Sequence, residues 1–320
     1  MSEFKVLYIA GSGRCGSTLL DNILGQLPGV CAVGEVRSLW EIGLLDGRRC
    51  GCGKPTAECP FWDDVLRRGF EHGAPRPEDV VSLQRHYLRI RPSQLARLIW
   101  ASLRGAPPTA LLGYLDTIER LYGAIAASAG ARLIVDSSKG PGDAFAIAKF
   151  TDVDLKVLHL VRDPRGVAHS WSRAKRADDD RPNGRMKTMG PLTSSTRWLA
   201  FNCAIEAMLR PALGAGYLRV RWEDFVARPS SVLAEIMEFA DLGGISPPLE
   251  DGRMVIEPTH SPSGNPDRVG RAEIRISDDQ RWTREMNPSD RVQATLLALP
   301  LLGHYGYTAK NTVAAADEHR

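Results

Sequence analysis

Hydrophobic residues along the chain gather in short, nearly continuous runs, separated by longer stretches with helical spacing. Most of these runs lack the strict alternation of apolar and polar positions that marks a half-exposed strand. Continuous runs are typical of strands that are buried on both faces of a parallel sheet. They predict five strands, at residues 5–11, 29–35, 132–138, 155–163 and 217–224.

Helical patterns lie between these strands, as in STLLDNILGQL after the first and PGDAFAIAKF after the third. The alternation favours an α/β fold, a P-loop-type parallel sheet of about five strands flanked by helices. Residues from about 60 to 130 hold no convincing strand and predict a helical insertion beside the sheet. Residues 174–195 are polar and punctuated by glycine and proline, which predicts a long mobile loop. We expect one domain over residues 1–310 and a disordered tail over 311–320.

Composition narrows the class of protein. The 320 residues are 43% hydrophobic and 25% charged, an ordinary globular balance. Since 41 basic and 38 acidic residues leave a net charge of only +3, no nucleic-acid partner is indicated, and any anion must be bound by a local arrangement. No apolar stretch reaches the roughly 18–20 residues of a membrane span or resembles a signal peptide, so a cytoplasmic protein is expected. The oligomeric state stays open, with a homodimer as one option.

The first predicted strand runs into a glycine-rich loop, GSGRCGST, that opens a helix. Gly11 and Gly16 fit the G-x-x-x-x-G spacing of a nucleotide phosphate loop, but Ser17-Thr18 follows where a lysine is required. Backbone N–H groups and the positive end of the helix dipole still favour an anion here. The loop cation is Arg14, whose planar guanidinium suits a tetrahedral anion; a surface arginine on a plain turn is the structural alternative.

A second candidate anion site follows the fourth predicted strand. The segment LKVLHLVRDPRGVAHS ends a strand at Arg162 and passes through a turn into a helix that carries Ser170. These two side chains are expected to converge on one phosphate. Two phosphate sites on one sheet suit a nucleotide that is phosphorylated at both its 3′ and its 5′ position.

In this order, the motifs resemble the sulfotransferase family that uses 3′-phosphoadenosine-5′-phosphosulfate (PAPS), in particular its bacterial members and its tyrosylprotein and carbohydrate branches. The loop resembles the family's 5′-phosphosulfate loop, and VRDPRGVAHS its 3′-phosphate motif. VRWEDFVARPSSVL, HSPSGNPDR and LLGHYGY resemble further family segments, so that the resemblance covers residues 5–307. It implies an enzyme that moves a sulfuryl group from PAPS to a hydroxyl of a small molecule, lipid or glycan, releasing 3′-phosphoadenosine 5′-phosphate (PAP) without a metal.

The resemblance also implies a donor site. Arg162 and Ser170 would hold the 3′-phosphate, and Arg268 would close over the nucleotide unless it is an exposed loop arginine. Trp222 stands where the family has a tyrosine beside adenine, with a core tryptophan as the alternative. The residues implied for the 5′-phosphosulfate are Gly13, Arg14, Cys15, Gly16, Ser17 and Thr18.

On the acceptor side, Glu35 is the candidate general base. It follows the second predicted strand at the carboxyl edge of the sheet, and AVGEVRSLW resembles the family's G-E-x-x-R segment at Gly34, Glu35 and Arg37. A structural carboxylate paired with Arg37 or Arg14 is the alternative. Lys139, after the third predicted strand, is expected to stabilise charge on the leaving group, unless it is a solvated loop lysine.

Other assignments stay open on the sequence. A histidine base is possible in principle, but His159 and His169 fit structural roles better. A P-loop kinase would use Asp136 as a magnesium ligand, and a non-catalytic PAP-binding module would need neither Glu35 nor Lys139. Two groups of residues bear on the acceptor. Four arginines would line a site for an acidic acceptor or belong to a solvated helix face: Arg85, Arg89, Arg91 and Arg97. Three tryptophans would line an apolar acceptor pocket or fill the core: Trp40, Trp62 and Trp100.

Three of the six cysteines cluster in CGCGKPTAECPFW. Cys50, Cys52 and Cys59 lack the usual C-x2-C spacing, and a zinc site would require a fourth ligand such as Cys31 or His72. A disulfide is disfavoured in the cytosol. We favour a tight loop that is anchored by Phe61 and Trp62, and we expect no metal.

Overall fold

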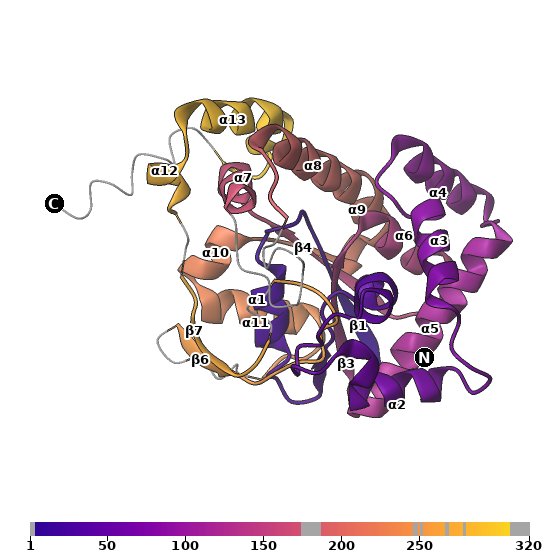
Figure 1. The fold of residues 1–320 in the computed structure, drawn as a ribbon. Coiled ribbons are helices and arrows are strands. Elements are labelled where there is room, and N and C mark those ends of the chain that lie inside the picture. Colours follow the sequence, from indigo (N-terminus) through magenta and orange to yellow (C-terminus); the bar gives the residue numbers. More distant parts are fainter. Residues whose placement is uncertain are drawn as a thin grey trace.

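Five parallel strands form the central sheet of the molecule (Figure 1). The computed structural model describes residues 4–173, 187–245, 249, 252–265, 269–277 and 280–307. The strands lie in the order β2-β3-β1-β4-β5, which places β1 in the centre. Their bounds are β1 Lys5–Ala10, β2 Val30–Ala32, β3 Leu133–Lys139, β4 Leu155–Val161 and β5 Tyr217–Arg221. The predicted α/β fold with a five-stranded parallel sheet is confirmed.

Four strands end earlier than the sequence predicts: β1 by one residue, and β2, β4 and β5 by two or more, each of these three for a local reason. β2 stops at Ala32 because Gly34 takes a φ of 64° and a short helix, η1 (Val36–Ser38), begins soon after. β4 stops before α7 (Pro164–Ser172), and β5 stops where α10 (Trp222–Ala227) begins. The polar residues after the strands therefore leave the sheet at its carboxyl edge, where α/β folds bind their ligands.

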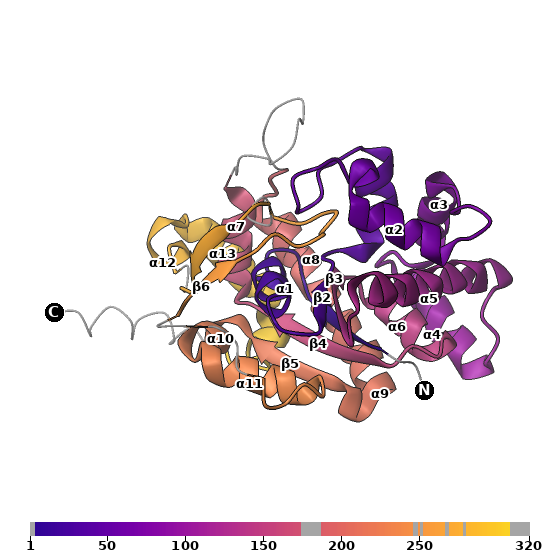
Figure 2. The ribbon, with the colours of Figure 1, turned by 90° about the horizontal axis from the view of Figure 1, so that it is seen from below.

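Helices cover both faces of the sheet (Figure 2). Val6 and Tyr8 of β1 belong to one core cluster and Leu7 and Ile9 to the other, and all four are fully buried. This two-sided burial is the reason for the continuous apolar runs in the sequence. The covering helices are α5 (Thr109–Ala129) and α6 (Pro141–Phe150) on the first face, and α1 (Ser17–Leu24) and α11 (Pro229–Phe239) on the second.

The predicted helical insertion lies between β2 and β3 and consists of α2 to α5, at one side of the sheet (Figure 1). α2, α3 and α4 each begin with a proline, which lacks the N–H that a first helical residue leaves unpaired. Their bounds are α2 Pro60–Gly69, α3 Pro77–Tyr87 and α4 Pro92–Arg104.

A third group of helices, α7, α8 (Pro191–Ala204) and α13 (Pro288–Leu302), packs around Trp198 and Tyr305. The start of α8 corrects the loop predicted for residues 174–195, because residues 191–195 are helical. Ser194 and Ser195 are buried on this helix, where their small size allows close packing. In the sequence, such polar residues are typical of a loop. Residues 174–186 lie outside the described part of the chain.

An antiparallel pair, β6 (Arg253–Ile256) and β7 (Ala272–Arg275), was not predicted. Each strand has only four residues. Of these eight residues, only Met254 and Ile256 are buried, and they pack against the second face of the sheet. The segment after β6 contacts the loop that follows β1 and the start of α1, both far away in the sequence.

The remaining elements are short. They are the π-helices η2 (Leu39–Leu45) and η4 (Ile205–Leu209), the 3-10 helices η3 (Thr56–Glu58) and η5 (Gly214–Gly216), and the α-helices α9 (Arg210–Leu213) and α12 (Trp282–Glu285). The predicted tail, 311–320, lies outside the described residues. Within the described ranges, none of the helices has both the length and the apolar character needed to cross a membrane.

Candidate active site

The glycine-rich loop joins β1 to α1 at the carboxyl edge of the sheet. Gly16 precedes the first helical residue with a φ of 101°. A Cβ on Gly16 would also lie 2.2 Å from the ring of Trp222, so both the backbone conformation and the tryptophan require glycine here. The first turn of α1 directs its unpaired N–H groups toward the loop, an arrangement suited to an anion.

Arg14 lies within this loop and is held by three neighbours. Its Nη1 donates a hydrogen bond to Asn265 Oδ1 at 3.2 Å, and its guanidinium lies 4.8 Å from the ring centre of Trp171. Its backbone oxygen accepts a hydrogen bond from Arg162 Nη1 at 3.3 Å. Arg14 is therefore a positioned, half-buried cation, and a second arginine lies beside it.

Glu35 and Lys139 form an ion pair between the ends of β2 and β3, with Oε1 and Nζ 2.5 Å apart. Their side chains are 23% and 13% exposed. Burial opposes the charge of Lys139, but the Glu35 carboxylate, together with the acidic groups of Cys15 and Asp21, raises the pKa of Lys139. Lys139 is therefore a largely buried cation with a carboxylate partner, which excludes the alternative of a solvated loop lysine.

The segment 259–265 links this ion pair to the glycine loop. Ser263 Oγ donates to Glu35 Oε2 at 3.4 Å. Two residues further on, Asn265 accepts the hydrogen bond from Arg14. Base candidate, ammonium group and loop arginine are thus joined by one continuous set of contacts.

Arg162 and Ser170 lie at the same edge. Arg162 directly follows β4, and Ser170 lies in α7. Its neighbour Trp171 donates a hydrogen bond from Nε1 to the oxygen of Gly13 at 3.3 Å, so α7 packs against the glycine loop. The ring of Trp222 lies 5.8 Å from the Arg162 guanidinium but is only 5% exposed, and it belongs to the core beneath the loop.

Arg37 forms a separate ion pair with Asp143 of α6. Tyr114 donates to Asp143 Oδ1 at 3.1 Å, and Gln84 Nε2 donates to the backbone oxygen of Arg37 at 3.1 Å. Burial opposes the charge of Arg37, but Asp143, together with Tyr114 and Tyr8, raises the pKa of the guanidinium. The arginine of the G-E-x-x-R-like segment therefore serves the structure, and the pairing of Glu35 is with Lys139.

The histidines considered as bases have structural surroundings. His159 is fully buried between Tyr217 Oη at 2.6 Å and Asn202 Oδ1 at 2.7 Å, and burial lowers its pKa to about 4. His169 faces Glu285, with Nε2 and Oε2 3.5 Å apart.

Asp136, the magnesium ligand of the kinase alternative, is engaged in the core. Its Oδ2 accepts a hydrogen bond from Tyr122 of α5 at 2.6 Å, and its Oδ1 accepts one from the backbone N–H of Ser138 at 2.8 Å. Burial raises its pKa to about 6. Its partner Tyr122 belongs to the core cluster on the face of the sheet opposite α1.

The helical insertion holds a cavity of about 340 Å³ between α3, α4 and α5. Trp100 and Arg97 line it, and Trp100 is 55% exposed. Trp40 and Trp62, by contrast, are fully buried and fill the core. Arg85 is paired with a glutamate at the surface, as expected of a solvated helix face.

The clustered cysteines lie beside His260, a residue that the sequence did not indicate as their neighbour. Cys50, Cys52 and Cys59 gather around His260, and Cys31 and His72 are not part of this group. His260 lies 201 positions after Cys59, a separation that no local spacing can reveal.

Three further contacts of the candidate site, made by Trp171, Ser263 and Asn265, do not follow from the sequence pattern. Trp171 follows Ser170 directly, but its packing on the loop depends on the placement of α7. Ser263 and Asn265 belong to HSPSGNPDR, a segment in which only Arg268 is singled out on sequence grounds. Arg268 itself lies outside the described residues.

The fold and the site together define an α/β protein with an arginine-bearing glycine loop and a carboxylate–ammonium pair at one sheet edge. The chain belongs to the sulfotransferase family, whose sequence profile matches residues 7–245. The solved sulfotransferase domain from the curacin biosynthetic pathway has a TM-score of 0.53 and 17% identity, with 93% of this chain and 97% of that chain covered.

The sulfotransferase domain of the Synechococcus PCC 7002 olefin synthase has a TM-score of 0.44 and 20% identity, with 91% and 93% covered. Sequence comparison with curated proteins finds no match. Similarity to the curacin-pathway domain at this identity shows a shared fold.

Proposed function

We propose that this sulfotransferase uses PAPS as its donor and transfers the sulfuryl group to an acceptor hydroxyl, with Glu35 as the general base. Membership of the family supports sulfuryl transfer. The observation that carries the finer proposal is the 2.5 Å ion pair of Glu35 and Lys139, which Ser263 and Asn265 connect to Arg14. These groups supply a base and two cations at one edge of the sheet.

The glycine loop is the proposed site of the 5′-phosphosulfate. Its N–H groups and the dipole of α1 favour an anion, and the hydroxyl of Thr18 adds a donor at the helix start. The fork of Arg14 suits the sulfuryl oxygens. Cys15 takes part only through its backbone, because its side chain is buried in the core, where burial raises the pKa of the thiol.

The 3′-phosphate is assigned to Arg162 and Ser170. Arg162 already contacts the backbone of Arg14, so both phosphate positions depend on the same loop. Since Trp222 is almost fully buried, its main proposed role is to support the loop beneath Gly16 and not to stack broadly on adenine.

In the proposed reaction, the acceptor O–H gives its proton to Glu35 while its oxygen forms a bond to sulfur. The bond between sulfur and the bridging oxygen breaks, and its electron pair leaves with PAP. Arg14 and the loop N–H groups stabilise the sulfuryl oxygens. Lys139 stabilises the charge that builds on the leaving phosphate.

The ion pair links these two ends of the reaction. Proton uptake neutralises Glu35 and removes the main partner of the Lys139 ammonium group. The positive charge of Lys139 then becomes fully effective at the moment when PAP gains negative charge. General base and leaving-group cation therefore act as one unit.

Ligand binding and transfer test the proposal together. PAP is expected to raise the thermal unfolding midpoint, and ATP with magnesium is not; the reverse result would support the kinase alternative. Radiolabelled PAPS, offered with phenols, lipid alcohols and glycans, should label an acceptor. Arg14→Gln should lower this transfer by about 10²–10³-fold, whereas Arg85→Gln, a surface arginine on α3, should leave it unchanged.

A further inference from the structure

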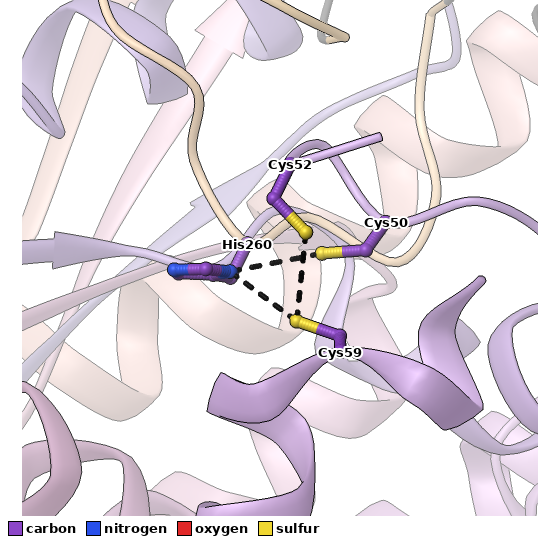
Figure 3. A group of neighbouring side chains, drawn as sticks. All are labelled: Cys50, Cys52, Cys59 and His260. Carbon is purple, nitrogen blue, oxygen red and sulfur yellow. Dashed lines mark hydrogen bonds between the residues drawn. The ribbon is translucent and has the colours of Figure 1, made fainter. Parts of the chain in front are cut away.

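Three cysteines and a histidine converge from two distant parts of the chain (Figure 3). Cys50 and Cys52 lie in the turn after η2, Cys59 directly precedes α2, and His260 lies in the segment after β6. One ligand atom from each residue can be chosen so that all four lie within 4.8 Å of one another. Cys50 and Cys59 are fully buried, and Cys52 and His260 are partly buried.

Three distances within this cluster match those of a tetrahedral metal site. Cys59 Sγ lies 3.4 Å from His260 Nδ1 and 3.6 Å from Cys52 Sγ, and Cys50 Sγ lies 3.8 Å from the same nitrogen. Bonds of about 2.3 Å to sulfur and about 2.0 Å to nitrogen place the ligands of zinc about 3.5–3.8 Å apart. Thiolate and imidazole ligands in this geometry select zinc among the common divalent ions.

Neighbouring aromatic residues fix the orientation of the histidine. Phe61 stacks on the His260 ring, with centres 4.4 Å apart and planes at 11°. Trp62 Nε1 donates a hydrogen bond to the backbone oxygen of His260 at 2.9 Å. Such support by surrounding residues is what holds a ligand ring in place at metal sites. The two aromatic anchors expected from the sequence thus position His260 against the sulfurs.

A disulfide accounts for less of this arrangement. It would join two of the thiols by a bond of about 2.05 Å, and it would not explain why the third cysteine and His260 lie in the same cluster. A metal uses all four groups. The expectation of no metal rested on the unusual spacing of the cysteines and on the lack of an evident fourth ligand. His260, distant in the sequence, is that fourth residue.

We propose that Cys50, Cys52, Cys59 and His260 bind one zinc ion. The three thiols release their protons to solvent as zinc binds, and His260 coordinates through neutral Nδ1. Four protein ligands leave no position for water or substrate, so the role of the ion is structural. This metal site stands whether or not PAPS is the donor.

The zinc site fixes the segment that joins the two halves of the candidate active site. The backbone N–H of Gly51 donates to the oxygen of Ser261 at 2.9 Å, so the cysteine turn and this segment are already paired. From His260 the chain continues to Ser263 and Asn265, which contact Glu35 and Arg14. Zinc therefore holds these contacts in register from outside the reaction centre.

Metal content of the intact protein, purified with a thiol reductant and without chelators, is the first test. Elemental analysis should find about one zinc per chain, and replacement by Co²⁺ should give thiolate charge-transfer bands and the strong visible absorption of a tetrahedral site. Protein that contains no stoichiometric zinc and gives no such cobalt spectrum would overturn the proposal. So would a mass two daltons low, which marks a disulfide, in place of bound metal.

Variants locate the site. Cys59→Ser and His260→Gln should each lower zinc content at least several-fold, while Cys203→Ser, on the exposed face of α8, should retain it. Equal zinc loss in Cys203→Ser would overturn the assignment. The cobalt spectrum of the unaltered protein keeps the test valid even if a variant fails to fold. Chelation should lower the thermal midpoint by several degrees and added zinc should restore it; an unchanged midpoint would overturn the structural role.

Discussion

Glu35 and Arg37 are two positions apart after β2, yet their ion pairs differ in surroundings and in use. The Glu35–Lys139 pair lies at the sheet edge, and Ser263 connects it to the glycine loop. The carboxylate of the Arg37–Asp143 pair is 3% exposed and is enclosed by the hydrogen bond of Tyr114. One short segment thus supplies one charge to the candidate active site and another charge to the core.

Backbone conformation separates the two pairs further. Lys139 has a φ of 69°, a left-handed conformation that is costly for a residue with a side chain. Asp143, by contrast, lies in the regular first turn of α6. Strain of this kind persists where surrounding contacts demand it and clusters at functional sites. The strained lysine therefore agrees with a functional pair, and the unstrained aspartate with a structural one.

The largest expected effect is on catalysis. Glu35→Gln keeps the shape of the side chain but removes the base, so sulfuryl transfer from labelled PAPS should fall by about 10²–10⁴-fold, with the thermal midpoint little changed. Glu41→Gln, in the same part of the chain and paired at the surface with Arg85, is the matched control and should retain transfer. Full activity of Glu35→Gln would remove Glu35 from the role of base.

Breaking the buried Arg37–Asp143 pair should instead lower stability and leave transfer activity nearly unchanged. Arg37→Met removes the cation beside the buried Asp143 carboxyl group, which is expected to cost about 3–5 kcal/mol of unfolding free energy in chemical denaturation. The folded fraction should keep transfer activity within a few-fold. A large loss of turnover without loss of stability would place Arg37 in the reaction centre and would erase the distinction between the two pairs.

A third carboxyl group, Asp21 of α1, tests what happens when burial outweighs the effect of a nearby cation, Lys139. It is 1% exposed, Oδ1 has no hydrogen-bond partner among the described residues, and burial raises its pKa to about 8 from 3.8. The folded state keeps a proton that the unfolded state loses above about pH 4, so stability should fall as the pH rises toward about 8.

Asp21→Asn should abolish this slope. The difference in unfolding free energy between variant and parent protein should shift in favour of the variant by about 1–3 kcal/mol between about pH 5.5 and pH 7.5. Denaturation curves at a series of pH values measure it. Parallel stability profiles of the two proteins would show that Asp21 does not hold a proton in the folded state.

The sequence predicted the parts of the molecule that depend on local patterning. Burial on both faces makes the strands visible as apolar runs, and the carboxyl edge follows from their direction, so Glu35, Lys139, Arg14 and Arg162 could be placed at one edge in advance. The partners of these residues could not be placed. Lys139 meets Glu35 across 104 positions of sequence, and no spacing rule selects one lysine from many.

The segment after β6 shows the limit most clearly. Ser263 and Asn265 reach Glu35 and Arg14 from 228 and 251 positions away, and His260 reaches Cys59 from 201. These contacts depend on a hairpin of two four-residue strands whose pattern is too short to recognise. The start of α8 was missed for a related reason, since its buried serines are polar but small.

The smallest effect on stability is expected at a surface ion pair, that of Asp241 with Lys156 and Lys5. Asp241 accepts from Lys156 at 2.6 Å and also pairs with Lys5, and the hydrogen bonds of Lys156 and Lys5 lower its pKa. Asp241 has a φ of 57°, which asparagine tolerates, so Asp241→Asn removes the charge without backbone strain. Because its side chain is 46% exposed, solvent screens these pairs.

Asp241→Asn should therefore change the unfolding free energy by less than about 1 kcal/mol at low salt, and by less still when salt is added. What stability the pairs contribute is present above the usual pKa of an aspartate and is lost as the pH falls through the lowered folded value, so the difference should vanish in acid. Denaturation at two ionic strengths measures this. A loss as large as that of Arg37→Met would mean that burial does not separate the pairs, and the distinction between a screened surface charge and a structural buried one would fail for this fold.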